Sequence, residues 1–214
     1  MSGDYRHPHL SRIDRAIAAL TAERARIIDT PPQVAFQGAA GAFSEQAARL
    51  FFAEAATLMP MRTLDDVFAA MDRHEVEFAV VPVENTLAGA VPGCLAAIRK
   101  SGANVIGERI LRIAQAAIGV PGATLLGARA AKSHPVALLQ CAAFFAEHPH
   151  VKAESTYDTA GAVDEIMRLA DPTVIAIAGL HAARQYGAVV LMEEVQDIAA
   201  NFTRFVLLGQ GSAR

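Results

Sequence analysis

The chain has 214 residues, 53% of them hydrophobic, and a formal net charge of −3 at pH 7. This length suffices to bury a core in one domain or in two small lobes. Acidic and basic residues are interspersed, so no basic stripe predicts a nucleic-acid partner. Neither an 18-residue apolar run nor a signal-peptide pattern occurs, so we expect a cytoplasmic protein without membrane insertion.

The first element expected along the chain is an amphipathic helix over residues 10–28, where apolar residues recur at helical spacing. It is predicted to end before Pro31 and Pro32, because the residue preceding a proline disfavours helical geometry. Residues 1–32 are therefore expected to form an N-terminal helical extension, and the main domain to begin after them.

From Gln33 onward, short β-branched runs alternate with alanine-rich helical stretches, which predicts an α/β fold with a largely parallel sheet. Strands are expected at 34–36, 78–83, 105–106, 114–120, 130–132, 174–178, 189–192 and 205–208. Helices are expected at 44–55, 63–73, 94–100, 135–147, 159–170 and 180–185. Ser44 and Asp158 suit N-cap positions, Pro135 suits a first helical turn, and Gly187 suits a left-handed C-cap.

Ligands of parallel α/β sheets bind beyond the carboxyl ends of the strands. Polar residues are concentrated in four of the predicted strand-to-helix turns, at 38–44, 84–89, 133–135 and 157–159. We expect these turns to line one cleft. In the first of them, backbone N–H groups near Gly38 and Gly41 can hold a carboxylate or phosphate, or the glycines can simply form a tight turn capped by Ser44.

Other polar residues also leave alternatives open. Glu84 follows a buried strand and suits an acid, a base or an orienting group, or a loop that satisfies its own backbone. Arg204 suits bidentate recognition of a carboxylate or a structural salt bridge. His134 suits a general acid, a metal ligand or a helix cap. The residues by themselves thus predict a small anionic ligand in a cleft.

Metal ions and nucleotide cofactors are not expected. The histidines show no HxxxH-type pairing, and Cys94 and Cys141 show neither metal-ligand spacing nor a disulfide framework. Neither a Walker A motif nor a GxGxxG motif is present.

Several separated segments resemble motifs of the prephenate dehydratase family, in the family's order. They are residues 38–48, 81–86 with Gly89 and Val91, 107–108, 133–135 with 139–141, 158–160 and 201–205. The resemblance covers residues 34–209. It implies two Rossmann-like lobes with a cleft between them, similar to type II periplasmic binding proteins. The lobes are expected at about 33–110 with 190–214, and at about 111–189.

The activity implied by the resemblance is the conversion of prephenate to phenylpyruvate, water and carbon dioxide in phenylalanine biosynthesis, without a cofactor. It implies catalytic roles for Thr203, Glu84 and Asn85, with Thr203 donating to the leaving hydroxyl and Glu84, or a water that it positions, as the ultimate acid. The substrate-binding residues implied are Arg204, Ser133, Gln140, Thr86, Thr159, Ser44 and Gly41. Arg204 alternatively braces the segment that carries Thr203.

The chain departs from the family pattern in three ways. Ala39 and Ala42 replace a proline and a hydroxyl residue, and Gln115 stands where a histidine is common. The chain ends at Arg214, so no regulatory ACT domain, and no feedback inhibition by phenylalanine through it, is expected. Arogenate dehydratase and a non-catalytic small-molecule-binding relative are the alternative functions. A homodimer or higher homo-oligomer is expected.

Overall fold

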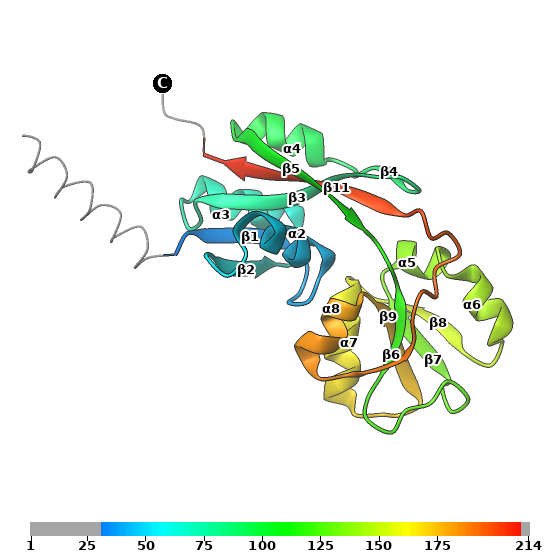
Figure 1. Cartoon of the computed structure of the whole chain (residues 1–214). Helices are drawn as coiled ribbons and strands as arrows, with labels where there is room; N and C mark the ends of the chain where they lie inside the picture. Colours follow the sequence, from blue (N-terminus) through cyan, green and yellow to red (C-terminus); the bar gives the residue numbers. More distant parts are fainter. Residues whose placement is uncertain (1–30, 211–214) are drawn as a thin grey trace, which may run out of the picture.

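The computed structural model describes residues 31–210, so the helix predicted over 10–28 lies outside it. The chain forms two α/β lobes, each built on its own sheet (Figure 1). Strands of the first sheet come from residues 33–112 and 202–209, and strands of the second come from residues 116–192. The predicted two-lobed α/β class is confirmed. No helix among residues 31–210 is long and apolar enough to cross a membrane.

The first sheet has the strand order β2-β1-β3-β11-β5, with β4 paired to β3. Its strands are β1 (Gln33–Gln37), β2 (Thr57–Met61), β3 (Phe78–Asn85), β4 (Gly89–Ala90), β5 (Asn104–Arg112) and β11 (Phe202–Gly209). Its helices are α2 (Phe43–Phe52), α3 (Leu64–Asp72) and α4 (Cys94–Ser101). β1 runs parallel to β2 and β3, whereas β11 runs antiparallel to β3 and β5.

The second sheet has the order β10-β6-β9-β7-β8. Its strands are β6 (Ala116–Gly119), β7 (Ala130–Ser133), β8 (Lys152–Ser155), β9 (Val174–Ala178) and β10 (Val189–Met192). Its helices are α5 (Pro135–Leu139), α6 (Ala142–Glu147), α7 (Thr159–Leu169) and α8 (Leu180–Tyr186). β7 is parallel to β8 and β9, but β6 is antiparallel to β9 and β10. Both sheets are therefore mixed rather than largely parallel as predicted.

Alternating side chains of the strands build a core on both faces of each sheet, because successive strand residues point to opposite sides. In the first lobe, Ala79 and Val81 pack with α3 and α4, while Val80 between them packs with α2. In the second lobe, Ala176 packs with α7 and α8, while Ile177 packs with α5 and α6. Strands covered on both faces read as continuous apolar runs, which explains why β3 and β9 were predicted correctly.

Three of the strands were not predicted from the sequence: the two-residue β4, and β2 and β8, which lie at sheet edges. β2 contains Pro60, which an edge strand tolerates because its N–H side needs no partner. All four residues of β8 are exposed, so no apolar run marks this strand. Edge strands bury little side-chain surface, and their sequence signal is correspondingly weak.

One predicted helix, 135–147, is two helices in the structure. The break falls at Gln140, whose carbonyl accepts a hydrogen bond from the Asp197 N–H at 2.7 Å. The Asp197 carboxylate in turn accepts from the N–H groups of Ala142 and Ala143 and caps α6. A distant segment of chain thus ends one helix and starts the next.

Two glycines allow the two lobes to come into direct contact. Gly41 has φ +85°, and a side chain there would lie 2.8 Å from the backbone of Ala182 in α8. Gly179 lies against the Phe43 ring, which a Cβ would approach to 2.9 Å. Phe36 of the first lobe also joins the core cluster around α7 and α8. This contact leaves the rest of the space between the lobes as a cleft.

Candidate active site

A cleft of about 570 Å³ lies between the lobes. Its polar lining residues come from both lobes and are Gln37, Ser44, Arg62, Asn85, Gln115, His134, Gln140, Tyr157, Asp158, Thr159 and Thr203. All four polar turns contribute at least one lining residue. Such a volume and mixed lining suit a small polar ligand.

Five of the predicted site residues line this cleft: Thr203, Asn85, Gln140, Thr159 and Ser44. They come from β11, β3, the α5–α6 break, the start of α7 and the start of α2. The structure therefore brings together residues that are up to about 160 positions apart in the sequence.

Glu84 and Arg204 do not line the cleft. They are directly paired across β3 and β11, and the Arg204 guanidinium lies 3.1 Å from the Glu84 carboxylate and 3.5 Å from that of Glu108. Because side chains alternate along a strand, their neighbours Asn85 and Thr203 face the cleft instead. Arg204 therefore forms a structural salt bridge, which is one of the two roles that the sequence allowed for it.

Ser133, Thr86 and Gly41 also lie outside the lining and are engaged by the backbone or by structural side chains. Ser133 is fully buried and donates to the Ile177 carbonyl. Thr86 accepts from the N–H of Phe202 at 2.9 Å. The Gly41 N–H donates to the Glu45 carboxylate.

The orientation of the Asn85 amide is fixed by the backbone. Its Oδ1 accepts hydrogen bonds from the N–H groups of Leu87 and Ala88, both at 2.9 Å. Its Nδ2 therefore faces the other way, toward Thr203 Oγ1 at 2.9 Å and Asn201 Oδ1 at 2.7 Å. An amide nitrogen can only donate, so the Thr203 oxygen accepts this bond.

The same logic extends to the second lobe through Asn201, which is fully buried. Since Asn201 Oδ1 accepts from Asn85, its Nδ2 is the group that donates to Gln140 Oε1, at 3.0 Å. The Thr203 hydrogen and the Gln140 Nε2 group then have no acceptor within residues 31–210. This amide relay, Asn85–Asn201–Gln140 with Thr203, presents two hydrogen-bond donors to the cleft. Asn201 was not predicted as a site residue, although it lies within one of the quoted motifs.

Arg62 is the one Lys or Arg among the residues that line the cleft. Its guanidinium stacks over the Tyr157 ring, 5.0 Å from the centroid, and pairs with no carboxylate of the described chain. Burial, followed by the charge of Asp158, raises the pKa of Tyr157, so this hydroxyl stays protonated at neutral pH. Sequence reasoning missed Arg62 because it follows β2, an unpredicted strand.

The start of α2 has free donors at the cleft. Its N-cap is Ala42, which offers no side-chain cap, so the prediction of Ser44 as the cap is wrong. The Ser44 side chain is nine-tenths buried, lines the cleft and makes no hydrogen bond within the described chain. Together with the helix N-terminus it is suited to an anion. Asp158, by contrast, is an N-cap as predicted, and its carboxylate accepts from Ala39 and Gly161.

Gln115 has an unsatisfied group. It is 3% exposed, and its Oε1 is buried without a hydrogen-bond partner in the described chain. Leaving a buried acceptor unpaired costs about 1–3 kcal/mol, so such groups are rare in native proteins.

Other groups give no support to nucleophilic or metal chemistry. Cys94 and Cys141 are buried with free thiols, and burial raises their pKa values to about 11 and about 12. No cluster of His, Cys, Asp or Glu placed to hold a metal ion occurs within residues 31–210. His134 Nδ1 accepts from the Val136 N–H, which is the capping role, although the residue also lines the cleft.

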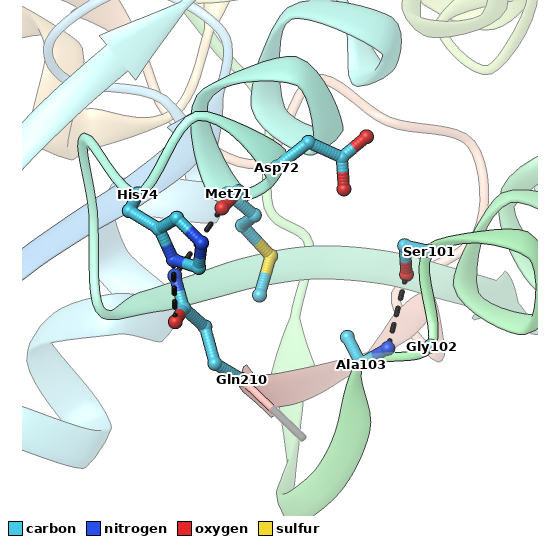
Figure 2. A pocket seen from close by; sticks show the side chains of 7 residues that line it. All are labelled: Met71, Asp72, His74, Ser101, Gly102, Ala103 and Gln210. Atoms are coloured by element: carbon cyan, nitrogen blue, oxygen red, sulfur yellow. Dashed lines mark hydrogen bonds between the residues drawn. The ribbon is translucent and has the colours of Figure 1, made fainter. Parts of the chain in front are cut away.

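A second hollow of about 260 Å³ lies in the first lobe, between the end of α3 and the end of α4. Figure 2 shows hydrogen bonds among most of its polar groups: His74 Nδ1 is 2.8 Å from Gln210 Oε1, and Ser101 Oγ accepts from the Ala103 N–H. Gln210 also donates to the Met71 carbonyl. This hollow lacks the unengaged donors that distinguish the cleft between the lobes.

A family model and several known proteins match most of this chain. A family model described as prephenate dehydratase matches residues 34–213. A bifunctional N-acyl-homoserine lactone acylase/prephenate dehydratase of Komagataeibacter europaeus is 33% identical over 84% of this chain and 63% of its own length. Arogenate dehydratase 2 of Petunia hybrida is 34% identical over 83% of this chain and 45% of its own.

Among solved structures, prephenate dehydratase from Arthrobacter aurescens in complex with L-Phe superposes with a TM-score of 0.77 at 27% identity, covering 85% of this chain and 61% of its own. The chain spans 45% to 63% of the length of these relatives. The family match extends over nearly all of the chain that follows the N-terminal extension. On this evidence the chain belongs to the prephenate dehydratase family.

Proposed function

We propose that this protein is a prephenate dehydratase, which converts prephenate to phenylpyruvate, water and carbon dioxide. The observation that carries the proposal is the amide relay, which leaves the Thr203 hydroxyl as a hydrogen-bond donor in the cleft. Membership of the family supports it.

In this reaction, the bond from the ring to its carboxylate breaks and the electron pair enters the ring, while the C4–oxygen bond breaks and the hydroxyl leaves. One proton is needed to release the hydroxyl as water. Thr203 donates a hydrogen bond to the departing oxygen, and the bond that it accepts from Asn85 strengthens this donation. Aromatisation of the ring supplies the driving force.

The net proton must come from a group other than threonine, which is a poor acid. Glu84, the acid implied by the resemblance, is paired with Arg204 outside the lining. We therefore assign the proton to water in the cleft, because His134 uses its Nδ1 to accept the capping bond and cannot also carry a proton there.

The substrate has two carboxylates, and the cleft has two groups suited to them. The start of α2 with Ser44 suits one, and Arg62 suits the other because guanidinium groups bind carboxylates with charge-assisted hydrogen bonds. Gln140 Nε2 adds a neutral donor. Arg204, in turn, is proposed to brace the strand that carries Thr203.

Replacing Arg62 by glutamine is expected to raise KM for prephenate about tenfold, the equivalent of one charge-assisted hydrogen bond, with kcat nearly unchanged. Steady-state kinetics provide the measurement. Arg204→Gln is the matched control, and its KM is expected to stay within about twofold because Arg204 lies outside the cleft lining. A tenfold higher KM for Arg204→Gln, with an unchanged KM for Arg62→Gln, would assign the carboxylate-binding role to Arg204 instead.

The proposed activity is tested by incubating the purified protein with prephenate at neutral to mildly alkaline pH, where spontaneous aromatisation is slow. Phenylpyruvate is followed by absorbance, and arogenate is assayed in parallel. Rapid turnover of prephenate is expected. Turnover of arogenate alone would make the protein an arogenate dehydratase, and binding without turnover of either compound would make it a non-catalytic relative.

The cytoplasmic location, the homo-oligomeric state and the division of the chain at about residues 110 and 189 stay predictions. Sedimentation of the purified protein would measure the oligomeric state.

A further inference from the structure

Gln115 lies where the chain crosses from β5 of the first lobe to β6 of the second. The segment that returns from β10 to β11 binds the backbone of Gln115. The Gln115 N–H donates to Gln196 Oε1 at 2.7 Å, and its carbonyl accepts from the Val195 N–H at 2.9 Å. The main chain of Gln115 is therefore fully bonded and fixed in position between the lobes.

The side chain of Gln115 is in the opposite situation. Gln115 lines the cleft and is only 3% exposed. Its Oε1 atom is buried and has no hydrogen-bond partner in the described chain. The nearby Gln196 shows the usual state of a buried amide, because its Oε1 accepts from Gln115 and its Nε2 donates to Glu194. A buried acceptor without a partner, on a residue that lines the cleft, is an acceptor that a donor group of a bound ligand can satisfy.

The Gln115 acceptor differs in polarity from the amides of the relay. The oxygens of Asn85 and Gln140 are both used inside the protein, so the amide relay offers only donors to the cleft. The Asp158 carboxylate accepts from two backbone N–H groups, both at its Oδ2 atom. Oxygen atoms of a bound carboxylate suit the donors, but a hydroxyl or ammonium group on the ligand needs an acceptor.

We propose that Gln115 is a substrate-binding residue whose Oε1 accepts a hydrogen bond from a hydroxyl or ammonium group of the substrate. This inference rests on the proposed function for the identity of the ligand. Prephenate carries one such donor, the ring hydroxyl, whereas arogenate carries an ammonium group as well. Gln115 contributes to the choice between the two compounds if its partner is the ammonium group, and binds both alike if its partner is the ring hydroxyl.

The test is Gln115→Met, which keeps the length and shape of the side chain and removes its amide. KM for the preferred substrate is expected to rise about tenfold, while the denaturant midpoint of the ligand-free protein stays the same or rises, because an unsatisfied group has been removed. If the Gln115 amide were structural instead, its removal would lower the midpoint and leave KM unchanged. The matched control, Gln196→Met, removes an amide bonded at both ends and is expected to lower the midpoint.

Comparison of the two compounds identifies the donor. An equal rise in KM for prephenate and arogenate assigns the ring hydroxyl, and a larger rise for arogenate assigns the ammonium group. An unchanged KM for both compounds, or a lowered midpoint without a change in KM, would overturn the proposal.

Calorimetric titration separates this proposal from the proposed function. If the wild-type protein turns over neither compound, the dehydratase activity fails, and the dissociation constants of wild type and Gln115→Met then decide the role of Gln115. A tenfold weaker constant in the variant supports the role. Equal constants, or a wild-type protein that binds neither compound, contradict it.

Discussion

Replacing Thr203 by valine is expected to lower kcat for prephenate about 100- to 1,000-fold, with KM changed less than about threefold. Valine has the shape of threonine, so the packing of this buried strand position is kept while the donor is lost. The hydrogen bond to the leaving oxygen strengthens only as that bond breaks, which is why kcat rather than KM carries the effect.

Thr203→Ser retains the hydroxyl and is expected to keep kcat within about tenfold of wild type. Thr57→Val, at the exposed start of the edge strand β2, serves as a control for the same chemical change away from the cleft. Near-normal turnover by Thr203→Val would remove Thr203 from the mechanism.

Asn85→Asp is expected to lower kcat by a similar factor of about 100 or more and, unlike Thr203→Val, also to raise KM. One oxygen of the new carboxylate still accepts from Leu87 and Ala88, so the other replaces Nδ2 and faces Thr203 and Asn201. Thr203 then donates its hydrogen to the carboxylate, and the cleft loses that donor.

The exchange of donor and acceptor groups continues along the amide relay. Asn201 must turn its nitrogen toward the carboxylate, and Gln140 must then turn its nitrogen toward Asn201. Gln140 thereby presents an oxygen to the cleft, where it repels an anionic substrate and raises KM. One atom changed in the first lobe thus alters the polarity of a side chain in the second.

Two comparisons test this account. Asn104→Asp introduces the same charge at an exposed position of β5 and is expected to leave both constants within about twofold. In the double variant with Thr203→Val, the losses in kcat are expected to be far from additive, because both changes remove the same donor. Additive losses in kcat, or an unchanged KM in Asn85→Asp, would contradict the relay.

The local sequence pattern predicted those elements whose residues carry their own signal. The apolar runs of β3 and β9 and the cap of α7 by Asp158 were predicted correctly. Strands buried on both faces and helix caps can be recognised because their residues are close together in the sequence. The edge strands β2 and β8 were missed, and with β2 its cleft residue Arg62, because an edge strand needs little apolar surface.

The sequence by itself determined the family, the two-lobed α/β class and the segments from which the cleft is built. Only the tertiary structure decided which side chain of each segment faces the cleft and with what polarity. Strand alternation places Thr203 inward and Arg204 outward, and hydrogen bonds between distant segments orient the amides of Asn85, Asn201 and Gln140. The physical reason is that an amide or a strand face has no preferred direction until its partners, here more than 50 residues away in sequence, are in place.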